Sequence, residues 1–214
     1  MTHVFQDKCD LIVHRINKDA KVLDVGFYGQ GTPMQDPYWV HAILKQHLSN
    51  PEKQLFGVDL EFPDHLFSEI NYKKQSAESF VYTERFDIIF AGDLIEHLVN
   101  PGLFFEQCKK HLAPNGSIII TTPNAFNLFN LAEKISKYEP TTNKDHVCYF
   151  NTRTLRQLLG KLGINTVVFS YIYTLHPSHV ESFKKKILNR VYYFFSFFTS
   201  KFLETLVVEC KIDL

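Results

Sequence analysis

The chain has 214 residues, of which 45% are hydrophobic, and its 23 Lys and Arg balance 23 Asp and Glu. This length fits one domain, and the apolar fraction is enough for a packed core, which excludes disordered and fibrous proteins. A formal net charge of zero gives no overall attraction to a polyanion, so we expect no nucleic-acid partner.

Strand-length apolar runs alternate with helical patterns along the chain. The runs cover residues 21–25, 54–59, 72–75, 86–91, 117–122, 166–173 and 205–211. The helical patterns cover residues 38–48, 100–112 and 151–162. Runs that are apolar throughout suit strands buried on both faces of a parallel sheet. This order predicts one α/β domain over residues 1–214, with a doubly wound, Rossmann-like, seven-stranded, mostly parallel sheet and helices on both faces.

A glycine-rich turn follows the first predicted strand, where Gly26, Gly29 and Gly31 come shortly after Asp24. In a doubly wound sheet, ligands bind outside the carboxyl ends of the strands. Glycine allows the backbone to turn tightly and to approach a ligand closely. The same residues also fit a plain turn, and the pattern alone leaves both interpretations open.

Asp59 ends the second predicted strand, and Glu61 follows it closely. A carboxylate at this position can accept hydrogen bonds from the hydroxyls of a ribose. The alternative is a solvated acid at the start of the next helix. We favour the ribose role because Asp59 follows a buried-looking strand and a glycine-rich first turn. The sequence contains no Gly-x-x-x-x-Gly-Lys-Ser/Thr motif, so a phosphate-binding loop for ATP is not supported.

Asp93, Glu96 and His97 come directly after the strand predicted at residues 86–91. They should therefore lie at the rim of the same pocket. His97 can act as a base near neutral pH or orient a substrate. The alternative is a helix-end histidine that hydrogen-bonds a carbonyl group.

Several motifs in chain order carry a family resemblance. They are residues 22–26 (VLDVG), 57–59 (GVD), 86–98 (FDIIFAGDLIEHL), 112–116 (LAPNG), 122–124 (TPN) and the last strand, 206–211. Their order and spacing resemble class I S-adenosylmethionine-dependent methyltransferases from about residue 20 to residue 170. Residues 36–39 (DPYW), 145–146 (DH) and 154–159 (TLRQLL) resemble the subgroup of small-molecule and sugar methyltransferases.

The resemblance implies S-adenosylmethionine as the cofactor and assigns residues to its parts. The turn from Asp24 to Gly31 would border the methionine part, Asp59 would take the ribose hydroxyls, and Asp93 would lie beside the sulfonium. The full set of implied cofactor-binding residues is Asp24, Gly26, Phe27, Gly29, Gly31, Asp59, Leu60, Ser76, Ala77, Glu78, Ala91, Gly92 and Asp93.

Two features differ from the family pattern. The glycine turn is one residue longer than usual, and Ser76 stands where many members have an acid. The adenine amino group is therefore expected to bind Ser76, Glu78 or backbone groups alone.

The implied reaction is methyl transfer to a small-molecule or glycan acceptor, with oxygen as the favoured atom. His97 and His146 are the candidate catalytic bases. No His, Cys and carboxylate residues share the spacing of a metal site, so no metal is expected. A non-catalytic S-adenosylmethionine-binding scaffold or regulatory subunit is the alternative function. A nicotinamide-dependent oxidoreductase would fit Asp59 but not the residues from Asp93 to His97.

A basic and aromatic segment, residues 181–203, precedes the last predicted strand as a helical insertion. Its apolar residues recur at helical spacing, which favours a helix packed over the sheet or the substrate pocket. The alternative is an interfacial helix over residues 184–202 whose lysines face anionic headgroups, which would suit a lipid-linked acceptor.

The cysteines and the N-terminal residues indicate the cellular compartment. The four cysteines, Cys9, Cys108, Cys148 and Cys210, form neither a CxxC pair nor a disulfide framework. The first residues lack the pattern of a signal peptide. We therefore expect a cytoplasmic protein with reduced thiols, either free of membranes or peripheral to one.

Overall fold

A single sheet organises the computed structural model, which describes residues 3–29, 38–63, 71–136, 143–173, 194 and 199–212. The sheet has eight strands in the order β1-β7-β8-β6-β5-β2-β3-β4. They are β1 (Val4–Phe5), β2 (Val22–Val25), β3 (Leu55–Asp59), β4 (Tyr72–Lys74), β5 (Phe86–Gly92), β6 (Leu112–Pro123), β7 (Thr166–Ile172) and β8 (Thr205–Lys211). The predicted strands are thus confirmed, and β1 is one strand more than expected.

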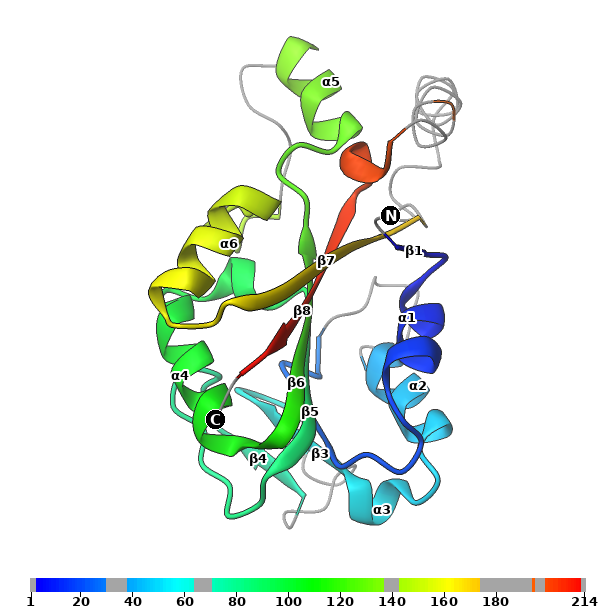
Figure 1. Cartoon of the computed structure of the whole chain (residues 1–214), viewed down its shortest axis with the longest axis vertical. Coiled ribbons are helices and arrows are strands. Elements are labelled where there is room, and N and C mark those ends of the chain that lie inside the picture. The colour runs from blue at the N-terminus through cyan, green and yellow to red at the C-terminus, as the bar shows by residue number, and fades with distance from the viewer. Residues whose placement is uncertain are drawn as a thin grey trace.

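Helices lie on both faces of this sheet, as predicted. They are α1 (Lys8–Arg15), α2 (Trp39–His47), α3 (Pro51–Gln54), α4 (Pro101–His111), α5 (Leu128–Ser136) and α6 (Thr152–Lys161), with short 3-10 helices η2 (Ile95–His97) and η4 (Ser200–Phe202). The helices α4 and α6 cover one face, whereas α1 and α2 cover the other (Figure 1).

Successive strands are added to the sheet on one side of β2 and then on the other, so the strand order reverses between β2 and β5. From β2 the strands run outward through β3 to β4, whereas β5 lies on the other side of β2 and leads to β6. All of these strands are parallel, and only β8 runs antiparallel to its neighbours β6 and β7. The carboxyl ends of β2 and β5 therefore form the switch point at which such sheets bind ligands.

Alternating side chains build two cores, one on each face. In β2, Leu23 and Val25 belong to the core beneath α4 and α6, and Val22 belongs to the core beneath α1 and α2. Both faces of a central strand are thus buried, which explains the nearly continuous apolar runs. Because successive side chains point to opposite faces, Asp24 faces α2.

Two helices begin at capping residues that the sequence contains. Asn100 precedes Pro101, and its side chain accepts a hydrogen bond from the backbone N–H of Leu103 at 3.3 Å. At α6 the Asn151 side chain accepts from Thr154 N at 3.0 Å, and the Thr154 hydroxyl lies 3.1 Å from Asn151 N. These contacts satisfy N–H groups that have no partner within the helix.

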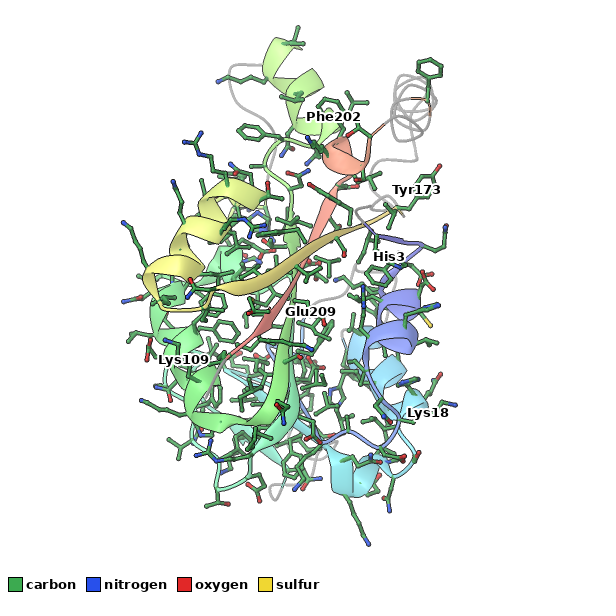
Figure 2. All side chains as sticks on the ribbon, in the orientation of Figure 1. His3, Lys18, Lys109, Tyr173, Phe202 and Glu209 are labelled. Carbon is green, nitrogen blue, oxygen red and sulfur yellow. The ribbon has the colours of Figure 1, made fainter. Side chains whose placement is uncertain are left out.

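The additional strand β1 extends the sheet along β7. The backbone N–H of Tyr171 donates to the carbonyl of His3 at 3.2 Å, and that of Tyr173 donates to Phe5 at 2.8 Å. Figure 2 shows His3 and Tyr173 near each other at this edge.

Parts of the sequence-based predictions fall outside the described residues. These parts are Gly31, the Asp-Pro of residues 36–37, and all of the basic and aromatic segment 181–203 except Phe194 and residues 199–203. The insertion at 181–203 and the single domain over 1–214 remain predictions. In the described part of the chain, no helix is long and apolar enough to cross a membrane.

Candidate functional site

The turn after β2 needs glycine at two positions. Gly26 and Gly29 have φ angles of 72° and 80°, a region that L side chains rarely adopt. A Cβ atom added to Gly26 would lie 2.7 Å from Leu94 Cδ1. The N–H of Gly26 donates to the carbonyl of Val58 at 2.8 Å, which ties the turn to β3. The glycines that the sequence suggested thus shape a close backbone turn at the switch point.

Asp24 is fully buried beside this turn, and only one of its two carboxylate oxygens has a hydrogen-bond partner among the described residues. Oδ2 lies 2.9 Å from His41 Nδ1, and His41 Nε2 lies 3.0 Å from the Tyr72 hydroxyl. Among the described residues, Asp24 Oδ1 has no hydrogen-bond partner. Burying a carboxylate oxygen without a partner lowers the stability of the fold, so this atom is suited to accept a hydrogen bond from a positively charged donor.

The Asp24–His41–Tyr72 chain was not predicted from the sequence. An arrangement in which His41 Nδ1 donates to Asp24 Oδ2 and the Tyr72 hydroxyl donates to His41 Nε2 gives both ring nitrogens a partner. Burial, together with the charge of Asp24, raises the pKa of Tyr72 far above its ordinary value, so this hydroxyl keeps its proton. His41 lies inside the predicted helix 38–48, where it has the spacing of a core residue. Its partners come from two other elements, and no local signal indicates them.

Asp59 connects the end of β3 to the glycine turn. Its Oδ2 accepts from the N–H of Tyr28 at 2.9 Å, and its Oδ1 accepts from the N–H of Leu60 at 2.7 Å. Burial raises the pKa of the Asp59 carboxyl, against the lowering effect of these backbone donors. Each carboxylate oxygen has two lone pairs. Oδ1 also accepts a longer hydrogen bond from the N–H of Glu61 at 3.5 Å, so the acceptor position that remains is on Oδ2, where it suits a ribose hydroxyl.

The residues predicted near adenine have protein partners of their own. Ser76 Oγ accepts from the N–H of Glu78 at 3.2 Å. Glu78 Oε1 accepts from the N–H of Asn100 at 2.7 Å, which holds the start of α4. Ala77 packs against the core beneath α4 and α6. The adenine contacts of these three residues remain predictions.

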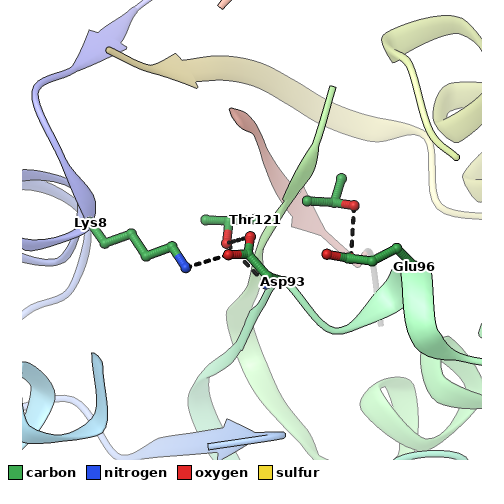
Figure 3. A network of polar contacts seen from close by, with 5 residues as sticks. Lys8, Asp93, Glu96 and Thr121 are labelled. Carbon is green, nitrogen blue, oxygen red and sulfur yellow. Dashed lines mark hydrogen bonds and ion pairs between the residues drawn. The ribbon is translucent and has the colours of Figure 1, made fainter. Parts of the chain in front are cut away.

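Asp93 follows β5 with a φ angle of 46° and is held from two sides. Its Oδ2 forms an ion pair with Lys8 Nζ at 2.6 Å, and its Oδ1 accepts from the Thr121 hydroxyl at 2.8 Å. Figure 3 shows Lys8 reaching from α1 to this carboxylate. Ala91 and Gly92, which precede Asp93, are buried. Lys8 is a site residue that the sequence did not indicate, because nothing in its helix points to a partner 85 positions away.

Glu96, His97 and His146 converge beside Asp93. Their potential ligand atoms lie within 4.8 Å of one another, and the rings of His97 and His146 have centroids 4.7 Å apart. Glu96 is buried, and its Oε2 accepts from the Thr122 hydroxyl at 2.9 Å. Burial, and secondly the charge of Asp93, raises the pKa of Glu96 to about 8. The two histidines predicted as catalytic are thus brought together, and Glu96 joins them as a group able to hold a metal ion.

His97 also makes the contact that the alternative interpretation describes. Its Nδ1 lies 3.1 Å from the carbonyl oxygen of Asp145. A carbonyl only accepts, so Nδ1 carries the proton, and the lone pair of a neutral ring is on Nε2. The contact therefore fixes the tautomer of His97 without occupying its second nitrogen.

Comparison with known proteins identifies the family. A family model described as "Methyltransferase domain" matches residues 1–168. The chain belongs to this methyltransferase family. The resemblance to class I S-adenosylmethionine-dependent methyltransferases is therefore confirmed, and S-adenosylmethionine is the cofactor of this methyltransferase.

Curated relatives of this methyltransferase are longer than the part that aligns with it. The ubiquinone biosynthesis O-methyltransferase of Bradyrhizobium diazoefficiens is 32% identical over 92 residues, which cover 39% of this chain and 36% of that protein. The protein with the same name in Azorhizobium caulinodans is 26% identical over 117 residues, covering 50% and 42%. The match thus spans about two fifths of the length of these relatives.

A solved structure supports the fold over almost the whole chain. The S-adenosylmethionine-dependent methyltransferase of Archaeoglobus fulgidus has a TM-score of 0.59 at 16% identity, covering 97% of this chain and 96% of that one. At this identity the similarity shows the Rossmann-like fold alone, which confirms the predicted fold class.

Proposed function

We propose that this methyltransferase transfers a methyl group from S-adenosylmethionine to an oxygen atom of a small-molecule or glycan acceptor. One observation carries the proposal: a fully buried carboxylate, Asp24, has an oxygen without a partner among the described residues at the switch point of the sheet. The glycine turn and Asp59 lie at the same edge, so three expected parts of a cofactor site occur together.

Each of these residues would hold a different part of the cofactor. The ammonium group of the methionine part suits Asp24 Oδ1, since a charged donor offsets the cost of a buried carboxylate. One ribose hydroxyl suits the remaining lone pair of Asp59 Oδ2, and a second would replace the long contact between Oδ1 and the N–H of Glu61. The backbone at Gly26 and Gly29 can approach the cofactor without a side chain between them.

The acceptor side would be formed by His97 and His146. S-adenosylmethionine supplies an electrophilic methyl group when it is bound. The protein's contribution is to align the acceptor and to exclude water. Burial, and secondly the neighbouring His97, lowers the pKa of His146, so this ring is neutral near pH 7 and can accept a proton from a hydroxyl group. His97 Nε2 is the second candidate for this role.

The favoured acceptor atom follows from the relatives. Two of them are named O-methyltransferases of ubiquinone biosynthesis, which supports a hydroxyl group of a small molecule as the acceptor. A glycan or a lipid-linked acceptor remains the alternative that the sequence suggested.

Calorimetry and a turnover assay test this function separately. We expect S-adenosylmethionine to bind at micromolar concentration and NAD not to bind. Release of S-adenosylhomocysteine with a panel of hydroxylated aromatic and sugar acceptors would identify the class of acceptor. Cofactor binding without release for any acceptor would favour the non-catalytic scaffold, and absence of cofactor binding would refute the proposal.

A further inference from the structure

His41 fixes the orientation of the buried Asp24 carboxylate. Asp24 lies in β2 and is fully buried, and His41, in the first turn of α2, is 2% exposed. His41 Nδ1 lies 2.9 Å from Asp24 Oδ2, whereas Oδ1 has no partner among the described residues. Turning the carboxylate away would break the contact with His41. This contact therefore determines which oxygen of Asp24 remains available and where it points.

Tyr72 holds the other side of the His41 ring. Its hydroxyl lies 3.0 Å from His41 Nε2, and the centroids of the two rings are 5.4 Å apart. Burial, and secondly the charge of Asp24, raises the pKa of Tyr72, so the hydroxyl stays protonated and is able to donate to Nε2. When Nε2 accepts this hydrogen bond, the proton of a neutral His41 ring lies on Nδ1 and faces Asp24.

The glycine turn packs against the same ring. Phe27, which directly follows Gly26 in this turn, is buried, and its ring centroid is 4.8 Å from that of His41. Gly57 in β3 leaves room for this packing, since a Cβ atom there would lie 2.7 Å from Tyr72 Cδ1 and 2.8 Å from Phe27 Cδ1. The ring of His41 is thus packed between the turn and β4, which limits its movement.

We propose that His41 is a positioning residue for cofactor binding. Held by the Tyr72 hydroxyl, it donates its Nδ1 proton to Asp24 Oδ2 and so directs Oδ1 toward the ammonium group of S-adenosylmethionine. A neutral ring leaves the carboxylate with its full negative charge, so Oδ1 keeps its attraction for a cation. His41 acts through Asp24 and not by contact with the cofactor. This role rests on the proposed function, in which Asp24 Oδ1 binds that ammonium group.

The role of His41 predicts a distinctive pattern of ligand affinities. The ammonium group is present both in S-adenosylmethionine and in its product S-adenosylhomocysteine, so loss of the His41 contact should weaken both ligands to the same extent. An analogue of S-adenosylhomocysteine that lacks only the amino group has no donor for Asp24 Oδ1. Its affinity should therefore not depend on His41. A purely structural role of His41 would weaken all of these ligands alike, because the whole pocket would change.

Calorimetric titration of the full chain with these ligands tests the role of His41. His41→Leu removes the donor and should weaken binding of S-adenosylmethionine and S-adenosylhomocysteine at least about fivefold, with no change for the deaminated analogue. His41→Asn keeps an amide N–H for Asp24 and should recover most of this loss.

His111→Asn is the matched control. His111 is also buried, and each of its ring nitrogens has a partner, since Nε2 accepts from the N–H of Tyr82 at 3.0 Å and Nδ1 lies 2.8 Å from the carbonyl oxygen of Gln107. It ends α4 beside the start of β6, away from the carboxyl ends of the strands. This variant should lower thermal stability and leave the affinity for each ligand unchanged.

The outcomes distinguish this role from the proposed function. If His41→Leu binds S-adenosylmethionine as tightly as the unchanged chain, or if the deaminated analogue loses as much affinity, the positioning role is refuted. Asp24→Asn then shows separately whether Asp24 contacts the cofactor. The nitrogen NMR shifts of the His41 ring in the unchanged chain do not depend on a stable variant. We expect a proton on Nδ1 and none on Nε2, and any other protonation state refutes the role even if His41→Leu fails to fold.

Discussion

Replacing Asp24 by Asn should separate cofactor binding from folding. Asp24 is fully buried, Oδ2 lies 2.9 Å from His41 Nδ1, and Oδ1 has no partner among the described residues. A hydrogen bond that involves a charged group contributes about 1.5–3 kcal/mol, and an unsatisfied buried polar atom costs about 1–3 kcal/mol. Asn keeps an oxygen for His41 but weakens that bond by removing the charge, and it replaces the unpartnered oxygen with an uncharged amide nitrogen that costs less to bury than a carboxylate oxygen. The free energy of unfolding should change by less than about 2 kcal/mol.

For cofactor affinity, no second effect compensates for the loss of the Asp24 charge. A contact between the Asp24 carboxylate and an ammonium group, worth about 1.5–3 kcal/mol, corresponds to roughly 10- to 150-fold in Kd. Calorimetric titration with S-adenosylmethionine measures this change, and thermal unfolding measures stability. Asp19→Asn, at an exposed position, is the control. If Asp24→Asn binds the cofactor as tightly as the unchanged chain, Asp24 does not face the ammonium group, and the reasoning is wrong.

Four further variants address other parts of the molecule. Gly26→Ala should lower the free energy of unfolding by about 1–2 kcal/mol, because φ is 72° and the new Cβ meets Leu94, as chemical denaturation will measure. Gly160→Ala, within α6 and with open space around its Cβ, should leave stability unchanged or raise it by up to about 1 kcal/mol. His97→Ala should cut turnover while S-adenosylmethionine affinity stays nearly constant, whereas a parallel loss of affinity and stability would make His97 structural. Replacing the three lysines of residues 184–186 by Ser should reduce co-sedimentation with anionic vesicles if this segment is interfacial, and a chain that ignores vesicles would support a packed helix.

The main strands could be predicted because their sequences carry the signal themselves. In a central strand such as β5, the residues from Ile89 to Gly92 are buried on both faces, and apart from Asp87 the strand reads as an apolar run. The added strand β1 has two residues, Val4 and Phe5, which are too few to show a periodicity. Its place in the sheet depends on β7, more than 160 positions along the chain. Only the tertiary structure determines such a strand.

The residues of the candidate site also fall into those that the sequence indicates and those that only the tertiary structure reveals. Asp24 lies one residue before the end of β2, Asp59 ends β3 and Asp93 follows β5, and position in an α/β sheet is enough to select them. His41 and Lys8 lie on helices and acquire their roles only through partners on other elements. His97 and His146 were each selected from motifs, but their contact with Glu96 depends on hydrogen bonds between η2 and a distant loop. Residue type and spacing therefore predicted which residues lie at the carboxyl edge of the sheet. They did not predict the contacts that residues of other elements make there.

The position of β8 between β6 and β7 has a consequence for how the chain folds. The strands β2 to β6 form a contiguous parallel block that can assemble from residues up to 123. By contrast, β8 lies between β7 and that block, and in the described part of the sheet β1 pairs with β7 alone. During synthesis, residues 4–5 therefore have no strand to pair with until residues 171–172 have left the ribosome, and the pair of β1 and β7 can join the parallel block only after residues 205–211 follow. Pairing over such separations is slow, and we expect the edge formed by β1 and β7 to be the last part of the sheet to become protected from hydrogen exchange.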